Sequence, residues 1–281
     1  MMALRKYLNP ALWYLTLTVL GIMFAFPFIW MILTGFQTGR QAGAFPPTII
    51  PDPWSLQGYI RGFTGHANFL RFFYNSSYIA VMSVIGAIFS STLVGYGFSR
   101  LRAPGKTFLF SVLLATMMIP NNVTLLPIFV IYSRFGWLNT HIPLILPSFL
   151  GMNAFCIFLM RQFFNSIPKE IAEAARVDGA SIFQVFYRVF LPNTKPAIFV
   201  VVLFTFVWSW NDFFAPLVFL TDSSMYTLAV GLNFFKGQFP GTTDYSPLMA
   251  MATFSMVPIL LMFLFAQKYF IEGIATTGLK G

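Results

Sequence analysis

The chain has 281 residues, of which 57% are hydrophobic and only 9% are charged. Soluble globular proteins carry about 25% charged residues, so this chain could not cover a water-facing surface and is expected to lie largely in lipid. Its formal net charge of +9 would suggest nucleic acid in a soluble protein, but the basic residues lie between apolar runs, which indicates membrane orientation instead.

Cysteine and histidine are sparse. Cys156 is the single cysteine, so no disulfide within the chain is expected. His66 and His141 lie far apart in the sequence and the acids are scattered, so no cluster has the spacing of metal ligands. We therefore expect neither a redox framework nor a bound metal.

Six apolar stretches are long enough to cross a bilayer as helices. A hydrocarbon core about 30 Å thick requires roughly 20 apolar helical residues, and a backbone in lipid must satisfy its own hydrogen bonds. The first stretch follows Arg5 and Lys6 and exceeds the ~7–15-residue core of a cleaved signal peptide, so we expect it to be retained. The predicted spans are Ala11–Thr34, Tyr74–Ser99, Thr107–Ser133, His141–Phe164, Pro196–Leu220 and Pro247–Phe270.

The basic residues predict the orientation of these spans. Cytoplasmic loops of membrane proteins carry an excess of Lys and Arg. With the N-terminus inside, 12 of the 17 basic residues lie on the cytoplasmic side, and the 5 outside are Arg40, Arg61, Arg71, Arg134 and Lys236. Both termini are therefore expected in the cytoplasm.

The longest cytoplasmic segment, residues 165–195, begins with a predicted short helix. Ser166 can cap it, and Pro168 suits its first turn. Glu170 and Glu173 lie near the positive end of the helix dipole. Gly179 is expected to end the helix, in the position where a left-handed residue commonly follows the last turn.

A second short helix is predicted directly after the first. Ser181 and Gln184 have the spacing of a capping box, and Pro192 is expected to stop this helix. The first helix offers small side chains at Ala172, Ala174 and Ala175, with polar contacts available from Glu173, Arg176 and Asp178. Such a pair could dock in a groove of another protein, or it could rest as an amphipathic helix on the membrane surface.

This segment resembles the EAA loop of binding-protein-dependent ABC importer permeases. That loop has the pattern Glu-Ala-Ala, three residues, Gly, nine residues, Ile-x-Leu-Pro. Here Glu173-Ala174-Ala175, Gly179 and Val189-x-Leu191-Pro192 match every spacing, with Val in place of Ile.

The resemblance covers roughly Tyr74 to Gly281 and is similar to the smaller six-span subunit of the maltose-type branch. It implies an all-α membrane protein with six transmembrane helices and the type I ABC importer permease (MetI-like) fold. Residues 1–73 would form the first span and an outer loop, and residues 74–281 the permease core. Further matching segments are Gly95–Lys106, Met118–Pro127, Gly136–Thr140, Trp210–Asp212 and Gln267–Gly273.

By resemblance, Glu173, Ala174, Ala175 and Gly179 would couple this chain to an ATPase subunit, with Arg176 and Asp178 as supporting contacts. The implied partners are a second permease subunit in a heterodimer, two ATPase subunits, an external solute-binding protein and membrane lipid, without nucleic acid. The implied location is the plasma (inner) membrane of a bacterium or archaeon. ATP and Mg²⁺ would be used by the partner ATPase, and this chain would bind no cofactor.

The chain itself is not expected to be an enzyme. Gly105-Lys106-Thr107 matches only the end of a phosphate-binding loop, because the position of the first glycine holds Arg100. The stretch also joins two spans rather than a strand and a helix. A basic cytoplasmic turn is the simpler interpretation.

Asp212 is the main acid within a predicted span. Such acids usually face the bundle or a cavity, because burying them in lipid costs about 2.5–3.5 kcal/mol. Asn211 and Asp212 could line the solute path, or Asp212 could make a structural hydrogen bond at a helix kink. Asn153 is a further candidate for the path, with a helix–helix hydrogen bond as the alternative.

The last outer loop, around Phe235–Tyr245, is expected by resemblance to reach toward the binding protein. Gln238, Phe239 and Asp244 could make that contact, or the loop could be a solvated connector.

Two other classes of membrane protein were weighed against the importer. An ion-coupled secondary transporter usually shows repeats and several buried ionisable groups, whereas here one acid stands out and no repeat is visible. A membrane scaffold would not need the EAA spacing either. The maltose-type resemblance implies a di- or oligosaccharide, with glycerol phosphate esters or another small polar solute as the alternative.

Overall fold

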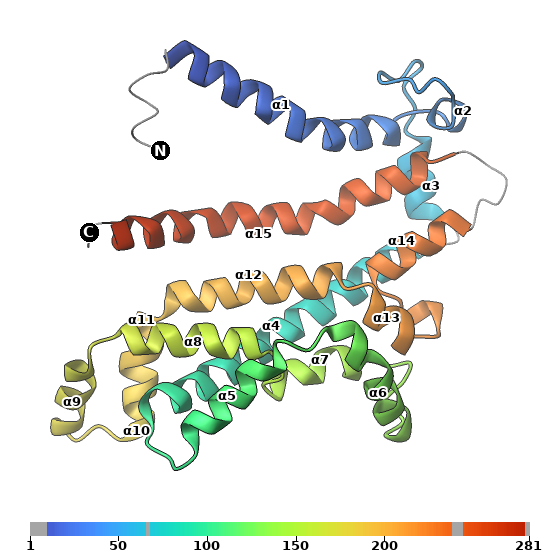
Figure 1. Ribbon diagram of the computed structural model, residues 1–281. Helices are drawn as coiled ribbons and strands as arrows, with labels where there is room; N and C mark the ends of the chain where they lie inside the picture. The colour runs from blue at the N-terminus through green and yellow to red at the C-terminus, as the bar shows by residue number, and fades with distance from the viewer. Residues whose placement is uncertain (1–9, 66–67, 238–243, 279–281) are drawn as a thin grey trace. The chain divides into compact units, whose positions relative to one another are not determined.

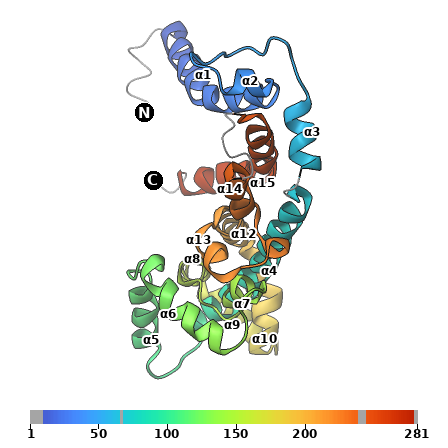
Figure 2. The ribbon, with the colours of Figure 1, turned by 90° about the vertical axis from the view of Figure 1, so that its right-hand side faces the viewer.

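A computed structural model describes residues 10–65, 68–237 and 244–278 as helices joined by loops (Figures 1 and 2), and the described residues contain no strand. Two compact units divide the chain: Met1–Phe69 with Leu232–Val257, and Leu70–Gly231 with Pro258–Gly281. The division expected from the sequence falls at residue 73, between the first span with its outer loop and the permease core. Compact units are a different kind of division and do not test this one, so it stays a prediction.

The first unit contains the first predicted span. Its helices are α1 (Pro10–Gly35), α2 (Gly39–Ala42), α3 (Gln57–Thr64) and the first part of α15 (Ser246–Gly278). Large apolar side chains of α1 are widely exposed, including Tyr14 at 67% and Phe24 at 68%. A helix with apolar side chains on all sides is suited to lipid.

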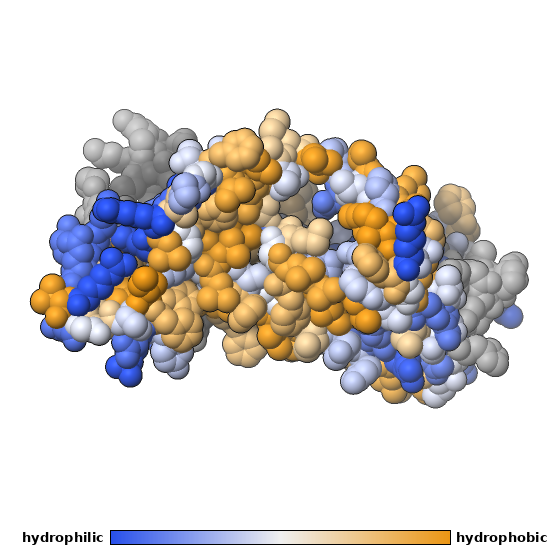
Figure 3. All heavy atoms as spheres, turned by 90° about the horizontal axis from the view of Figure 1, so that it is seen from below, coloured by the Kyte–Doolittle hydropathy of each residue, from blue (hydrophilic) through white to orange (hydrophobic). Residues whose placement is uncertain are grey.

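The second unit holds most of the helices. They are α4 (Phe69–Arg100), α5 (Lys106–Thr116), α6 (Asn121–Arg134), α7 (Ile142–Phe149), α8 (Ala154–Ser166), α9 (Lys169–Val177), α10 (Ile182–Gln184), the π-helix η2 (Val185–Phe190), α11 (Leu191–Asn193), α12 (Lys195–Asn211), α13 (Phe214–Phe219), the 3₁₀-helix η3 (Ser223–Met225) and the part of α15 from Pro258 on. The helix α14 (Leu228–Gly237) begins in this unit, and its residues from Leu232 on belong to the first unit. On the face of this unit seen in Figure 3, hydrophobic side chains form a broad band between hydrophilic groups. A surface whose middle meets lipid and whose ends meet water has this pattern.

Among the described residues, four helical stretches are long and apolar enough to cross a membrane, and there are up to six if two bent pairs each count as one span. The four are Leu12–Gly35, Phe69–Arg100, Ile142–Ser166 and Ser246–Phe265. The bent pairs are Lys106–Thr116 with Asn121–Arg134, at 101°, and Ile182–Asn193 with Lys195–Asn211, at 75°. All six predicted spans therefore fall on a candidate span.

Two predicted spans need correction in their course. The third is not a straight helix but breaks between Thr116 and Asn121, where Pro120 supplies no backbone N–H. The fifth does not run on to Leu220, because α12 ends at Asn211 and α13 is a separate short helix.

An aromatic cluster forms the core of the second unit. Tyr96 of α4 lies 5.8 Å from Phe164 of α8, 5.0 Å from Phe186 and 5.3 Å from Phe190, measured between ring centroids. All four side chains are buried. This cluster packs the segment after α9 against the ends of two long helices.

Close packing of α4 against α8 depends on Gly95. A Cβ at this position would lie 2.9 Å from the Met160 Cβ and 3.1 Å from the backbone nitrogen of Arg161. Overpacking costs about 1–3 kcal/mol, which exceeds the gain of about 1 kcal/mol in helix propensity. We expect Gly95→Ala to lower the thermal unfolding midpoint of the purified chain in detergent.

Gly97 provides the matched control on the same helix. A Cβ there would meet nothing within 4 Å, so Gly97→Ala should be neutral or stabilise the chain by up to about 1 kcal/mol. Equal shifts for the two variants would contradict close packing at Gly95.

Candidate functional site

The first short helix of residues 165–195, α9, ends as the sequence predicts. Gly179 has φ +83°, and its N–H donates to the Arg176 carbonyl at 3.0 Å. The Ala180 N–H donates to the Ala175 carbonyl, also at 3.0 Å. These two bonds form the Schellman motif, in which a left-handed residue closes a helix.

The predicted cap at the start of α9 is wrong. Ser166 belongs to α8, where its Oγ donates to the Phe163 carbonyl at 2.8 Å. The residue that precedes α9 is Pro168, without a side-chain cap. Because Ser166 completes the last turn of α8, it is not available to α9.

The second short helix begins with the predicted capping box. The Ser181 N–H donates to Gln184 Oε1 at 2.7 Å, and the Gln184 N–H donates to Ser181 Oγ at 3.2 Å. The prediction that Pro192 stops this helix is wrong. Pro192 lies in the first turn of α11, where its missing N–H costs little. The helix ends at Asn193, before the chain turns into α12.

One side of the α9–η2 segment packs on the core, and the other side is exposed. Ala172, Ala175 and Ala180 are half-buried against the aromatic cluster. Of the six residues predicted to couple to a partner, Ala175 therefore faces inward. The other five are exposed: Glu173, Ala174, Arg176, Asp178 and Gly179.

Large apolar side chains accompany these exposed polar groups. Val177 is 87% exposed, Phe183 67% and Tyr187 62%. Their exposure could not be predicted from the sequence, because 57% of the residues in this chain are hydrophobic and three more carry no signal. These residues together are termed the α9–η2 face: Glu173, Ala174, Arg176, Val177, Asp178, Gly179, Phe183 and Tyr187.

Arg100 joins the ends of three elements beneath this face. Its Nη2 donates to the carbonyls of Phe164 and Ile167, at the end of α8. Its guanidinium carbon lies 4.7 Å from the centroid of the Phe190 ring in η2. Arg100 itself ends α4, so α4, α8 and η2 meet at one side chain.

Residues 101–105, which end in the glycine of the incomplete phosphate-binding pattern, form a turn between α4 and α5. Gly105 has φ +74° and immediately precedes α5, and Lys106 Nζ donates to the Leu101 carbonyl at 2.8 Å. Among the described residues, no group of three or more His, Cys, Asp or Glu could hold a metal ion.

Two of the three predicted path residues border one cavity. It has a volume of about 170 Å³ and is lined by Asn153 and Asp212 together with Ile79, Ser83, Leu144, Ser148, Thr205, Trp208, Ser209, Pro216 and Thr227. Asn211 is not among them: it is exposed, and its Nδ2 donates to the Val207 carbonyl at 2.9 Å.

Asp212 and Asn153 also cap helices. Asp212 Oδ1 accepts the Ala215 N–H at 3.3 Å in the first turn of α13, and Asn153 Oδ1 accepts the Cys156 N–H at 3.3 Å at the start of α8. For Asp212, both alternatives considered from the sequence are therefore present: the side chain makes a structural hydrogen bond at a helix break, and it also lines a cavity. For Asn153, the bond is a cap rather than the helix–helix contact considered from the sequence.

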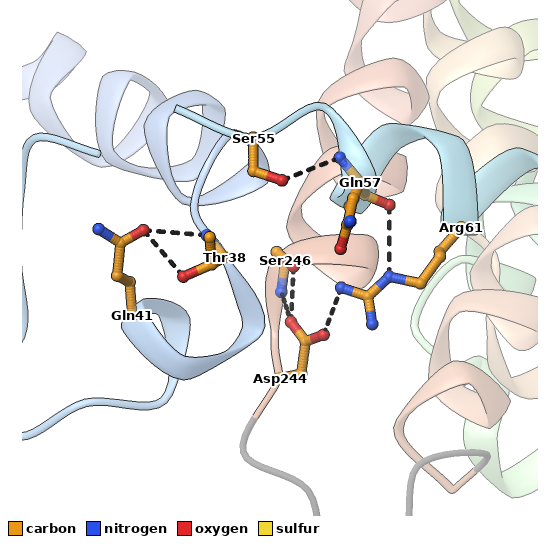
Figure 4. Close-up of polar contacts among 7 residues, drawn as sticks. All are labelled: Thr38, Gln41, Ser55, Gln57, Arg61, Asp244 and Ser246. Atoms are coloured by element: carbon orange, nitrogen blue, oxygen red, sulfur yellow. Dashed lines mark hydrogen bonds and ion pairs between the residues drawn. The ribbon is translucent and has the colours of Figure 1, made fainter. Parts of the chain in front are cut away.

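Asp244, proposed from resemblance as a contact for a binding protein, already has partners within the first unit. Its carboxylate lies 2.6 Å from an Arg61 guanidinium nitrogen and accepts the N–H and the hydroxyl of Ser246 at 3.0 and 2.5 Å (Figure 4). The Asp244 side chain is 12% exposed. Gln238 and Phe239 lie outside the described residues.

Comparison with known proteins gives relatives along nearly the whole chain. Residues 83–276 match the family described as binding-protein-dependent transport system inner membrane component. The arabinooligosaccharides transport system permease protein AraQ of Halalkalibacterium halodurans is 32% identical, over 99% of this chain and 100% of the relative. The probable ABC transporter permease protein YurM of Bacillus subtilis is also 32% identical, over 92% of this chain and 85% of the relative.

The fold has a counterpart among solved structures. A chain of a bacterial ABC transporter involved in the import of the acidic polysaccharide alginate matches with a TM-score of 0.80 and 24% identity, over 92% of this chain and 95% of that one. The family match over residues 83–276 covers more than half of the chain. The chain is a multi-pass membrane protein of the binding-protein-dependent transport system inner membrane component family.

Proposed function

We propose that this chain is one permease subunit of an ATP-driven importer for a di- or oligosaccharide in the plasma membrane of a bacterium or archaeon. The family and the relative that is named for arabinooligosaccharide transport support the transport class and the sugar. The observation that carries the mechanism is the α9–η2 face, which exposes three large apolar side chains together with three charged and two small residues.

The α9–η2 face docks on an ATPase subunit. Interfaces are strongest where exposed aromatic and apolar anchors are surrounded by polar groups. Phe183 and Tyr187 are exposed on the same segment as the charged residues Glu173 and Arg176 and can serve as such anchors. A movement of this segment reaches α4 and α8 through Arg100 and the aromatic cluster. ATP and Mg²⁺ act in the partner, and this chain contributes no catalytic residue.

The remaining partners follow from the same assignment. A second permease subunit completes the path as a heterodimer, two ATPase subunits bind from the cytoplasm, and an external binding protein delivers the sugar. The excess of basic residues places both termini and the α9–η2 face inside. Asp244, fixed by Arg61 and Ser246, holds the start of α15, while Gln238 and Phe239 remain the candidates for direct contact with the binding protein.

Purification of the tagged chain from its native membranes in mild detergent tests the proposal. Mass spectrometry of the preparation should find a second permease and an ATPase, and an unrelated tagged membrane protein from the same cells serves as control. A homogeneous chain, without an ATPase above that control, would contradict the importer and favour a secondary transporter.

A further inference from the structure

The cavity beside Asp212 holds a buried hydroxyl without a partner. Thr227 is 2% exposed, and its Oγ1 has no hydrogen-bond partner among the described residues. Leaving a buried polar group unpaired costs about 1–3 kcal/mol, so native proteins usually satisfy it with water or a ligand. Since Thr227 lines the cavity, whatever fills the cavity is the available partner.

Seven of the eleven residues that line the cavity carry polar side chains: Ser83, Ser148, Asn153, Thr205, Ser209, Asp212 and Thr227. Serine, threonine and asparagine side chains from α4, α7, α8 and α12 meet there, with the Trp208 ring beside them. One Asp212 oxygen caps α13, and a carboxylate can accept several hydrogen bonds at once, so the same group can also accept one from a ligand. An aromatic ring with several hydroxyls and one carboxyl is a surface suited to a ring that bears many hydroxyl groups.

The size and the charge of the cavity narrow the ligand class. Its volume of about 170 Å³ is roughly ten times the space that one water molecule requires, which suits a single sugar ring. The described lining residues include one carboxyl group and no Lys, Arg or His. An anionic ring would bring two like charges together without a cation, which is unfavourable at a partly buried site.

We propose that this cavity binds one ring of a neutral polyhydroxylated solute, that Thr227 donates or accepts a hydrogen bond to it, and that Asp212 disfavours rings carrying a carboxylate or phosphate. The proposal rests on the importer function proposed above and adds the charge class of the solute. Asp212 is thereby a specificity-determining residue in addition to a helix cap.

Equilibrium binding to the whole importer complex tests this assignment. The complex is placed in lipid nanodiscs without the binding protein, and the probes are arabinotriose and maltotriose as neutral sugars and an alginate trisaccharide as the acidic one. We expect at least one neutral probe to bind at least tenfold more tightly than the acidic probe. Failure of every neutral probe to bind would mean that the cavity holds water only and would overturn the proposal.

Three variants assign the binding to this cavity. Thr227→Val keeps the side-chain shape and should weaken the neutral probe about three- to tenfold. Asp212→Asn keeps an oxygen for the Ala215 N–H, and so the cap, and should reduce the preference for neutral over acidic sugar at least fivefold. Thr221→Val replaces an exposed threonine that does not line the cavity and should change neither value.

If all three variants bind the probes with the affinity and selectivity of the unsubstituted complex, the sugar binds elsewhere in the complex and the proposal is overturned. In that case, co-purification of the ATPase and sugar uptake by the complex would still stand. Loss of the importer function itself would appear instead as the absence of any ATPase in the preparation. The two failures are therefore distinguishable.

Discussion

Replacement of Arg100 by Leu is expected to destabilise the chain by about 2–4 kcal/mol. The substitution removes two hydrogen bonds from a charged donor to the carbonyls of Phe164 and Ile167, each worth about 1.5–3 kcal/mol. It also removes a contact with the Phe190 ring. Part of the loss is offset, because the buried Nε of Arg100 has no partner among the described residues.

Thermal unfolding in detergent measures the total loss, and hydrogen exchange locates it. Exchange should rise in residues 169–193, since Arg100 fixes this segment to the ends of α4 and α8. Arg100→Lys keeps the charge but presents one nitrogen instead of a fork, so its effect should be intermediate.

Arg102 is the matched control, because it is exposed and lies two positions further along the chain. Arg102→Gln should fall within about 0.5 kcal/mol of the original chain. An equal loss in Arg100→Leu and Arg102→Gln would show that the charge of the turn matters rather than the contacts of Arg100.

The spans and the two short helices of residues 165–195 could be predicted because their signals are local. Apolar length defines a span wherever lipid is the solvent, and Gly179 and the Ser181–Gln184 pair act through bonds within a few residues. The break before Asn121 escaped the same reasoning. Residues 117–120 are apolar or proline, so hydropathy continues through them while the helix does not.

The candidate site depended more on contacts between distant residues. Asp244 looked like a free acid in an outer loop, but Arg61 lies far from it in sequence and beside it in the structure. The cavity at Asp212 combines residues from four helices and a loop, and no single stretch contains its pattern. Likewise, the sequence gives Arg100 only as one more basic residue at a membrane boundary. Its contacts depend on the positions of α8 and η2, which the sequence does not reveal.

Charge reversal at Glu173 is expected to separate ATPase binding from the stability of the chain. Glu173 is exposed on α9, and exposed substitutions usually change stability by less than about 0.5 kcal/mol. On the proposed docking surface, however, Glu173→Lys places a wrong charge beside the anchors Phe183 and Tyr187. Like-charge or unpaired contacts at an interface cost several kcal/mol, so ATPase recovered with the tagged chain should fall at least tenfold.

Phe183→Ser tests the apolar part of the same surface. The ring is 67% exposed in this chain, so its loss should leave the unfolding midpoint nearly unchanged, while truncation of a buried interface anchor typically costs 2 kcal/mol or more of binding. Arg102→Glu controls for a reversed charge elsewhere on the cytoplasmic side. Normal ATPase recovery with both Glu173→Lys and Phe183→Ser would exclude the α9–η2 face as the docking surface, because neither its charge nor its apolar anchor would then contribute to binding.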